Sequence, residues 1–445
     1  MAKPKTTFVC QNCAAEYSKW SGKCENCNHW NTMLEQAQSA TQSGRGGGGS
    51  PLKSQKLTDV SASIGKDRID TSFPDINAVV GGGIVRGGVY LLAGQPGIGK
   101  STLLLQLAAA ISGEHKVLYV SGEESLSQLK MRAERLSVEK KDLEVVSSTD
   151  GNDIAASIAS KKYDLVIVDS IQTMSINEIS SAPGSVSQIT NTANVVTRAG
   201  KNSDTAIVLV GHVTKEGNIA GPKVLEHLVD VVLNFEGDRY GGFKVIRAVK
   251  NRYGSTSEVA IMEMKEEGLT LAKNPSEALL SERQAGDGSV VLATIEGSRP
   301  LLVEVQALVT PTSFGYPKRT ASGFDLNRLN LLIAMLSRRT KLNLSEKDVF
   351  INIVGGIRIT DPAADLAICM AIASASKGMM LKDDAVVFGE VGLSGEVRHV
   401  SHVEKRAQEA KKLGFSYAIG PKSKESFIKP VQNIREALNT TLSKK

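Results

Sequence analysis

Between residues 58 and 274, short apolar runs alternate with segments of helical pattern. Four of these runs are short and continuously apolar, which is typical of strands buried in a parallel sheet. They occupy residues 89–93, 117–120, 165–168 and 207–210. The Leu- and Ala-rich run 103–111 instead predicts a buried helix that stops at Gly113. This alternation predicts an α/β domain with a mainly parallel sheet.

The loop between the first strand and this helix has the G-x-x-x-x-G-K-[ST] spacing of a phosphate-binding loop. Its glycines allow backbone N–H groups to converge on an anion, and the helix N-terminus adds partial positive charge. We expect Lys100 to reach the β- and γ-phosphates and Ser101 to hold Mg²⁺. The alternative, a glycine-rich turn without a ligand, is disfavoured by the strand–loop–helix context. The residues assigned to ATP are Gly94, Gln95, Pro96, Gly97, Ile98, Gly99, Lys100, Ser101 and Thr102.

Acidic and imidazole side chains follow three of the other strands. Asp169 ends the run 165–168 and is the Walker B candidate that orients Mg²⁺. Glu123 is the first candidate for the carboxylate that polarises the attacking water; Glu124 is the second, and could instead cap the next helix. His212 lies where a γ-phosphate sensor would sit, although a polar histidine at a strand end is the simpler alternative.

A basic pair, Lys250 and Arg252, follows an apolar strand at 243–249, within the sequence Lys-Asn-Arg-Tyr-Gly. Residues two apart on an extended chain point the same way. The pair could reach a nucleotide held by a neighbouring subunit and neutralise transition-state charge, as an arginine finger does. A solvated strand end is the alternative. Before this strand, residues 215–227 contain two glycines and two lysines and predict a mobile loop.

Four cysteines near the N-terminus form two C-x-x-C pairs, at a spacing that suits a tetrahedral thiolate Zn²⁺ site. The segment is too small to hold a core without the metal. A redox pair is the alternative, but no βαβ unit surrounds these residues. His29 could replace one ligand. The residues predicted to bind zinc are Cys10, Cys13, Cys24 and Cys27.

The 445-residue chain has a net charge of +6, which permits contact with a polyanion but does not prove it. No apolar run is long enough to cross a bilayer, and no secretory signal is visible, so we expect no membrane association and a reducing cytoplasm. The fifth cysteine, Cys369, lies in an apolar run and is most simply a buried small side chain.

With its four-cysteine module, P-loop and Lys250–Gly254 pentapeptide, the chain resembles the RadA (Sms) family of bacterial DNA repair proteins from end to end. The family has Phe where this chain has Tyr253. The resemblance implies a RecA-like ATPase core, in which Glu123 matches the catalytic glutamate and the pair Lys250 and Arg252 acts across a subunit interface. It also implies a homo-oligomeric ring, expected to be a hexamer, that works on single-stranded and branched DNA, with the recombinase RecA as partner.

From about residue 275 the pattern changes, with strands expected at 290–295, 301–309 and 349–354 and a helix at 326–338. The last hundred residues are similar to the Lon protease domain, whose members use a Ser–Lys dyad. Here the serine position matches Ala363 and the lysine position matches Glu404, so we expect a proteolytically inactive scaffold. Its basic residues are candidate phosphate contacts, although such residues are usually solvated: Lys318, Arg319, Arg328, Arg338, Arg339, Lys341 and Arg358.

The chain therefore divides into a C4 zinc finger at 1–34, a flexible linker at 35–57 that is rich in Gly and Ser, a RecA-like P-loop ATPase at 58–274 and an α+β Lon-protease-like domain at 275–445. The leading hypothesis is a DNA-dependent ATPase that promotes branch migration and extends strand exchange in recombinational repair. An ATP-dependent protease and an ATP-regulated scaffold that switches partners are the alternatives.

Overall fold

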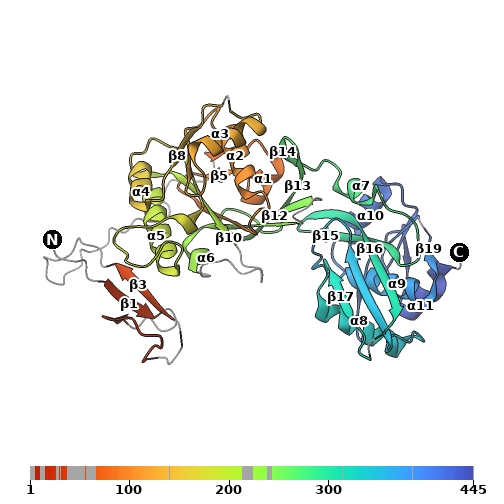
Figure 1. Cartoon of the computed structure of the whole chain (residues 1–445). Coiled ribbons are helices and arrows are strands. Elements are labelled where there is room, and N and C mark those ends of the chain that lie inside the picture. The colour runs from red at the N-terminus through yellow and green to blue at the C-terminus, as the bar shows by residue number, and fades with distance from the viewer. Residues whose placement is uncertain are drawn as a thin grey trace. The chain divides into compact units, whose positions relative to one another are not determined.

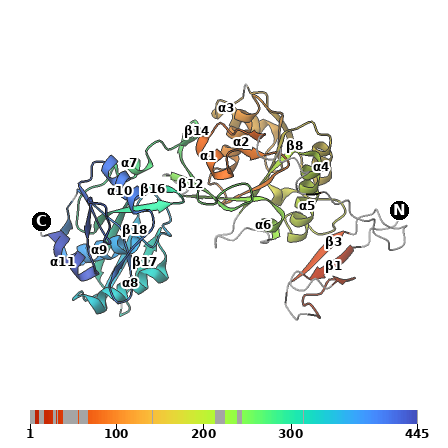
Figure 2. The same cartoon turned by 180° about the vertical axis from the view of Figure 1, so that it is seen from behind.

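The computed structural model describes residues 6–10, 16–26, 30, 32–37, 56, 67–139, 141–212, 224–237, 243–313, 315–382 and 384–443. The chain forms two compact units (Figures 1 and 2). The first consists of Met1–Phe235 together with Ile246–Thr256 and Lys265–Leu269. The second consists of Thr270–Lys445 together with Glu236–Val245 and Ser257–Met264. The chain between residues 236 and 269 thus contributes segments to both units.

The ATPase core is built on a nine-stranded sheet with the order β14-β13-β12-β11-β6-β10-β9-β7-β8. The six strands from β11 to β8 pair in parallel throughout, which confirms the predicted sheet type. The strands are β6 (Val89–Gly94), β7 (Val117–Ser121), β8 (Glu144–Ser147), β9 (Leu165–Asp169), β10 (Ala206–His212), β11 (Val231–Gly237), β12 (Phe243–Asn251), β13 (Val259–Lys265) and β14 (Gly268–Leu271).

Alternating side chains of β6 pack against helices on the two faces of the sheet. Val89 and Leu91 belong to one apolar cluster, with buried residues of α4 and α5. Tyr90 and Leu92 face the opposite way and line a small apolar space with residues of α1 and α2. The parallel strands therefore lie between two helical layers. The helices are α1 (Pro74–Val80), α2 (Lys100–Ile111), α3 (Leu126–Arg135), α4 (Gly151–Ala159), α5 (Val186–Ser203) and α6 (Val224–Leu228).

Helix α6 corrects the loop predicted at 215–227. Leu225 and Val229 are fully buried in the same cluster as α4 and α5, so this apolar pair draws the end of the segment into helical packing. Residues 213–223 lie outside the described part of the chain.

The N-terminal module contains a three-stranded antiparallel sheet with the order β2-β1-β3. Its strands are β1 (Thr6–Cys10), β2 (Glu16–Tyr17) and β3 (Met33–Ala37). Within the ATPase domain, just before β6 in the sequence, β4 (Arg68–Ile69) pairs with β5 (Ile84–Val85).

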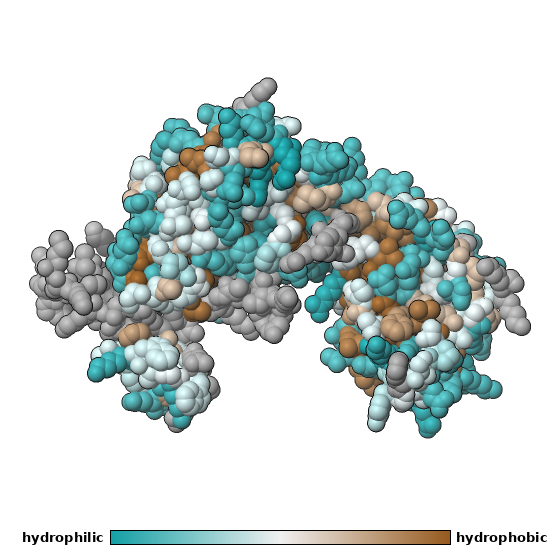
Figure 3. Space-filling view, in the orientation of Figure 1, coloured by the Kyte–Doolittle hydropathy of each residue, from teal (hydrophilic) through white to brown (hydrophobic). Residues whose placement is uncertain are grey.

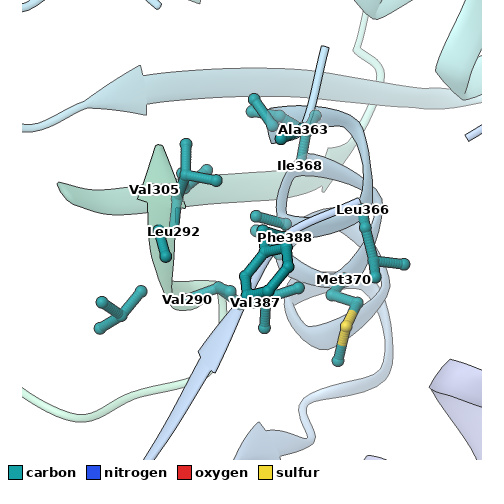
Figure 4. Close-up of a cluster of buried hydrophobic side chains, with 14 of the residues drawn as sticks. Val290, Leu292, Val305, Ala363, Leu366, Ile368, Met370, Val387 and Phe388 are labelled. Atoms are coloured by element: carbon teal, nitrogen blue, oxygen red, sulfur yellow. The ribbon is translucent and has the colours of Figure 1, made fainter. Parts of the chain in front are cut away.

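The C-terminal unit is an α+β fold on a seven-stranded sheet with the order β17-β18-β16-β15-β20-β23-β24. The antiparallel pair β15–β16 carries core residues such as Leu292 and Val305, which belong to the same buried cluster as Leu366 and Ile368 of α9 (Figure 4). The principal elements are α7 (Pro275–Leu280), β15 (Ser289–Glu296), β16 (Arg299–Pro311), β17 (Arg319–Ser322), α8 (Leu326–Arg339), β18 (Lys347–Ile353), α9 (Ala364–Lys377), β20 (Ala385–Val387), α10 (Val403–Lys412), β23 (Tyr417–Gly420), β24 (Ile428–Pro430) and α11 (Ile434–Thr441). The two-stranded ladders are β19 (Met380–Leu381) with β25 (Leu442–Ser443), and β21 (Glu390–Val391) with β22 (Val397–Arg398).

Hydrophilic residues dominate the face of the molecule shown in Figure 3, and hydrophobic residues gather there in smaller patches. Within the described residues, no helix combines the length and the apolar character needed to span a membrane. Cys369 is fully buried in α9, as predicted.

Candidate functional site

The phosphate-binding loop joins the carboxyl end of β6 to the first turn of α2. Gly97 and Gly99 adopt φ angles of 77° and 116°, a region that side chains with a Cβ disfavour. Among the described residues no side chain caps the N-terminus of α2, so its first N–H groups remain available to an anion. At Gly94, a Cβ would lie 2.6 Å from the carbonyl oxygen of Phe235 on β11. The loop thus has the backbone geometry of a phosphate cradle.

Lys100, the first residue of α2, is buried and folds back onto the loop. Its Nζ donates to the carbonyl oxygens of Gly94 at 2.8 Å and Gln95 at 3.0 Å. Burial lowers the pKa of Lys100 to about 8, although the charges of Asp169 and Glu123 oppose this shift. The negative charge of a bound phosphate would stabilise the protonated form of Lys100.

A single imidazole joins Lys100 to Glu123. His212 at the end of β10 lies 3.1 Å from Lys100 Nζ through Nδ1 and 3.1 Å from Glu123 Oε1 through Nε2. An ammonium group has only donors, so Nδ1 accepts and Nε2–H donates to the carboxylate. Three of the residues predicted from the sequence therefore form one hydrogen-bonded chain at the carboxyl edge of the sheet.

Glu123 is fixed from a second direction by Ser170, whose hydroxyl donates to the same Oε1. The hydrogen bond from His212 is the main reason why the pKa of Glu123 falls to about 2; burial opposes the shift and the Ser170 hydroxyl contributes to it. Glu123 is therefore ionised at neutral pH, as a residue that orients water requires. Ser170 was not predicted, because nothing in the sequence shows that it faces β7.

Asp169 is buried at the end of β9 and is held by a residue that the sequence analysis missed. The hydroxyl of Tyr119 on β7 donates to Asp169 Oδ2 at 2.5 Å. Burial and the neighbouring carboxylate raise the pKa of Tyr119, which keeps its hydroxyl protonated as a donor. Tyr119 pairs with Ile167 in the parallel ladder, two residues before Ser121 pairs with Asp169. Sequence alone does not give this register.

Glu124 has a different environment from Glu123. Its carboxylate forms an ion pair with Arg132 of α3. The proposed alternative, that Glu124 caps this helix, is wrong, because Ser125 is the N-cap and forms a capping box with Gln128.

Lys250 and Arg252 both point toward the segment that precedes β11. Lys250 Nζ donates to the carbonyl oxygens of Glu226 at 2.6 Å and Val229 at 2.7 Å. Arg252 Nη1 lies 3.2 Å from Asp230 Oδ1. Burial is the main cause that lowers the pKa of Lys250, and the charge of Arg252 adds to it. The two cations therefore point toward one target, as expected, and within this chain that target is the segment 226–230.

The segment 226–230 lies at the amino ends of the parallel strands, whereas the phosphate-binding loop lies at their carboxyl ends. Asp230 Oδ2 accepts the N–H of Val89, the first residue of β6, whereas the loop begins at Gly94, its last residue. Five residue steps of a parallel strand span about 16 Å. The structure therefore does not bring Lys250 and Arg252 to Lys100 of the same chain.

Comparisons with known proteins agree with this architecture. Residues 53–218 match a family model described as AAA domain, residues 330–424 match Subunit ChlI of Mg-chelatase, and residues 8–35 match a rubredoxin metal binding domain. The DNA repair protein RadA of Bacillus subtilis is 47% identical over 99% of this chain and 100% of its own length. RadA of Listeria monocytogenes is 45% identical over 99% of both chains. The chain belongs to the RadA family.

RadA of Aquifex aeolicus is 43% identical over 98% of this chain and 99% of its own length. Among solved structures, one ATPase domain aligns with a TM-score of 0.41 and 13% identity, over 48% of this chain and 94% of that chain; that likeness supports no further inference. The predicted fold class is confirmed: a RecA-like ATPase core lies between an N-terminal zinc ribbon and a C-terminal Lon-like domain.

The RadA-family zinc ribbon is partly visible. Cys10 and Cys24 are almost fully buried, whereas the two tryptophans of the same segment, Trp20 and Trp30, are largely exposed. Burial of thiols in place of aromatic rings fits a metal centre rather than an apolar core. Cys13, Cys27 and His29 lie outside the described residues. Cys10 and Cys24 fit as two of the thiolates that would hold Zn²⁺, whose role is to fold the segment.

In the Lon-like domain, Ala363 is fully buried at the start of α9 (Figure 4). Glu404 is exposed on α10. Near them lies a buried ion pair, in which Arg406 Nη1 is 2.7 Å from Asp361 Oδ2 and also donates to the carbonyl oxygen of Ala293. Ala363 packs in the core of the domain and offers no hydroxyl, and Glu404 faces solvent.

The basic candidates in this domain separate into two groups. Arg328 forms an ion pair with buried Asp365 and also donates to the carbonyl oxygen of Val391, so its charge is committed within the domain. Arg319 and Arg339 also donate to backbone carbonyl oxygens, those of Leu344 and Leu393. The exposed residues Lys318, Arg338, Lys341 and Arg358 remain candidate phosphate contacts.

Proposed function

We propose that this chain is a DNA-dependent ATPase of recombinational DNA repair, acting in the cytoplasm as a ring-shaped motor, expected to be a hexamer. On single-stranded and branched DNA, and with the recombinase RecA as partner, it would promote branch migration and extend strand exchange. One observation carries the proposal: the nucleotide-binding residues and the basic pair occupy opposite edges of the same sheet. Each site then needs a neighbouring subunit to complete it.

In this proposal the residues of one subunit hold and polarise the nucleotide. The phosphate-binding loop and Lys100 hold the phosphates, and Ser101 with Asp169 holds Mg²⁺. Glu123 polarises the attacking water, and His212 senses the γ-phosphate because it already contacts both Lys100 and Glu123. Arg252 and Lys250 of the adjacent subunit neutralise charge in the transition state.

Two features support DNA as the polymer that stimulates hydrolysis. The net charge is +6, and exposed basic residues occur on the C-terminal domain. The buried alanine at the serine position of the expected Ser–Lys dyad supports a scaffold for DNA contact and ring assembly rather than a protease.

The test is ATP turnover measured with and without single-stranded DNA over a range of salt concentrations. We expect stimulation by DNA that weakens as salt rises, because phosphate contacts release counterions. Lys100→Ala should stay folded and lose turnover both with and without DNA. Turnover that is indifferent to DNA, or that survives in Lys100→Ala, would contradict the proposal.

A further inference from the structure

Asp230 is a buried carboxylate just before β11 that is contacted from three separate segments of the chain. Oδ2 accepts the N–H of Val89 at 3.1 Å, and Oδ1 lies 3.2 Å from both Lys201 Nζ and Arg252 Nη1. Burial, and after it the nearby charge of Asp230, raises the pKa of the Tyr253 hydroxyl. The side chain of Asp230 is only 5% exposed. No motif in the sequence drew attention to this residue.

The side chain of Arg252 is 58% exposed, in contrast to the buried carboxylate of Asp230 that holds it. One nitrogen is tied to Asp230, and the rest of the rigid five-donor fork faces solvent. The backbone reinforces this position, since Arg252 N donates to the carbonyl oxygen of Asp230 at 3.2 Å. An anchored stem with an exposed head is the arrangement that a residue acting on another molecule requires.

The charged groups around Asp230 support the same conclusion, that Arg252 is held in place to act on another molecule. Lys201, Lys250 and Arg252 all lie on this side of the segment, and the positive charge of Arg252 contributes to the lowered pKa of Lys250. Glu226 also faces this group. Without the carboxylate of Asp230 the three cations would repel one another, and Arg252 would have no fixed direction.

We propose that Asp230 is a positioning residue that aims Arg252 at the nucleotide held by the adjacent subunit. This inference rests on the proposed function, in which Arg252 acts between subunits. Anchoring one nitrogen removes much of the rotamer freedom of a long side chain before the nucleotide arrives. The benefit of holding Arg252 in place should therefore appear in the rate of turnover rather than in the affinity for nucleotide.

Asp230→Asn separates this role from a purely structural one. The asparagine oxygen can still accept the N–H of Val89, but the negative charge that holds Arg252 is gone. We expect kcat to fall about tenfold while KM for ATP changes less than about twofold. Lys201→Ala is the matched control: it removes the other cation on Asp230, so turnover should stay near that of the parent protein. Unchanged kcat in Asp230→Asn would overturn the inference.

A double variant tests whether Asp230 acts through Arg252. Adding Asp230→Asn to Arg252→Ala should cause no further loss of kcat, because the group that Asp230 aims is already absent. An additive loss would overturn the inference. If Asp230→Asn does not fold, Tyr253→Phe removes the hydroxyl that lies near Asp230 and should lower kcat about twofold; full turnover in that variant would then overturn it.

Mixing subunits distinguishes failure of this inference from failure of the proposed function. Asp230→Asn subunits keep an intact phosphate-binding loop, so Lys100→Ala subunits, which supply a correctly held Arg252, should restore part of their turnover. If Arg252→Ala is rescued in this way but Asp230→Asn has full turnover by itself, only the role of Asp230 is wrong. If Arg252→Ala alone retains full turnover, the intersubunit function itself is wrong.

Discussion

At the scale of single residues, the site is organised by the imidazole that links Lys100 to Glu123. Nδ1 of His212 accepts from the ammonium group and Nε2 donates to the carboxylate, so one imidazole ring contacts both. Bound phosphates would compete for Lys100, and the same ring would register that change next to Glu123. The proposal that His212 senses the γ-phosphate rests on these two contacts, which its place at a strand end could not show.

The low pKa of Glu123 leads to a prediction about stability. Its pKa is lowered from 4.5 to about 2, chiefly by the hydrogen bond from His212, so the folded state binds this proton less readily than the unfolded state. The stabilisation is present above about pH 4.5 and is lost as pH falls toward 2. The difference in unfolding free energy between the parent and Glu123→Gln should be constant from pH 8 to about 5, then shrink. Denaturant unfolding at several pH values measures it, and a difference that grows on acidification would contradict the assignment.

Tyr119 supports a second prediction at this scale. A hydrogen bond to a charged group contributes about 1.5–3 kcal/mol, and Tyr119→Phe removes only the hydroxyl that binds Asp169. We expect the Mg²⁺ concentration for half-maximal turnover to rise about tenfold, because the carboxylate is no longer oriented. Tyr163→Phe is the control, since the hydroxyl of Tyr163 binds the exposed Glu144. An unchanged Mg²⁺ requirement in Tyr119→Phe would show that Asp169 needs no such support.

At the scale of elements, the phosphate-binding loop depends on close approach between two strands. A Cβ on Gly94 would lie 2.6 Å from the backbone carbonyl oxygen of Phe235 on β11. A backbone atom cannot move aside as the end of a flexible side chain can. Gly94→Ala should therefore destabilise the core by about 1–3 kcal/mol and weaken ATP binding. Gly113→Ala, where the nearest atom would be 3.7 Å away, should have little effect. Equal thermal midpoints for the two variants would refute this reason for the glycine.

Sequence patterns predicted the buried elements well and the contacts between them poorly. The strands expected at 89–93 and 165–168 are present as Val89–Gly94 and Leu165–Asp169, because a strand covered on both faces leaves a continuous apolar run. Edge strand β8 has no buried residue and left no such run. The contacts of Asp169 with Tyr119 and of Arg252 with Asp230 depend on register and chain direction, which local periodicity does not encode.

At the scale of the whole molecule, the N-terminal ribbon should be a separate folding unit. Its described thiols, Cys10 and Cys24, are buried in a segment with little apolar core, so zinc is expected to supply its stability. Chelation should release about one Zn²⁺ per chain and unfold β1 to β3, while the ATPase core keeps its thermal midpoint. Cys10→Ser should reproduce the effect. Loss of the core transition on chelation would contradict an independent ribbon.

In the proposed ring, the placement of Lys100 and Arg252 at opposite ends of the strands would make the assembly, rather than the single chain, the catalytic unit. Lys100→Ala removes the nucleotide grip of a subunit and leaves its basic pair intact, whereas Arg252→Ala does the reverse. Each variant alone should be nearly inactive, because every interface then lacks one half of the site.

The most direct measurement is the ATP turnover of an equal mixture of Lys100→Ala and Arg252→Ala subunits, assembled with DNA. In a randomly mixed ring, about a quarter of the interfaces combine an intact loop with an intact arginine. Turnover should therefore recover to about a quarter of the parent value. A mixture no more active than its two components would contradict a nucleotide site completed between subunits.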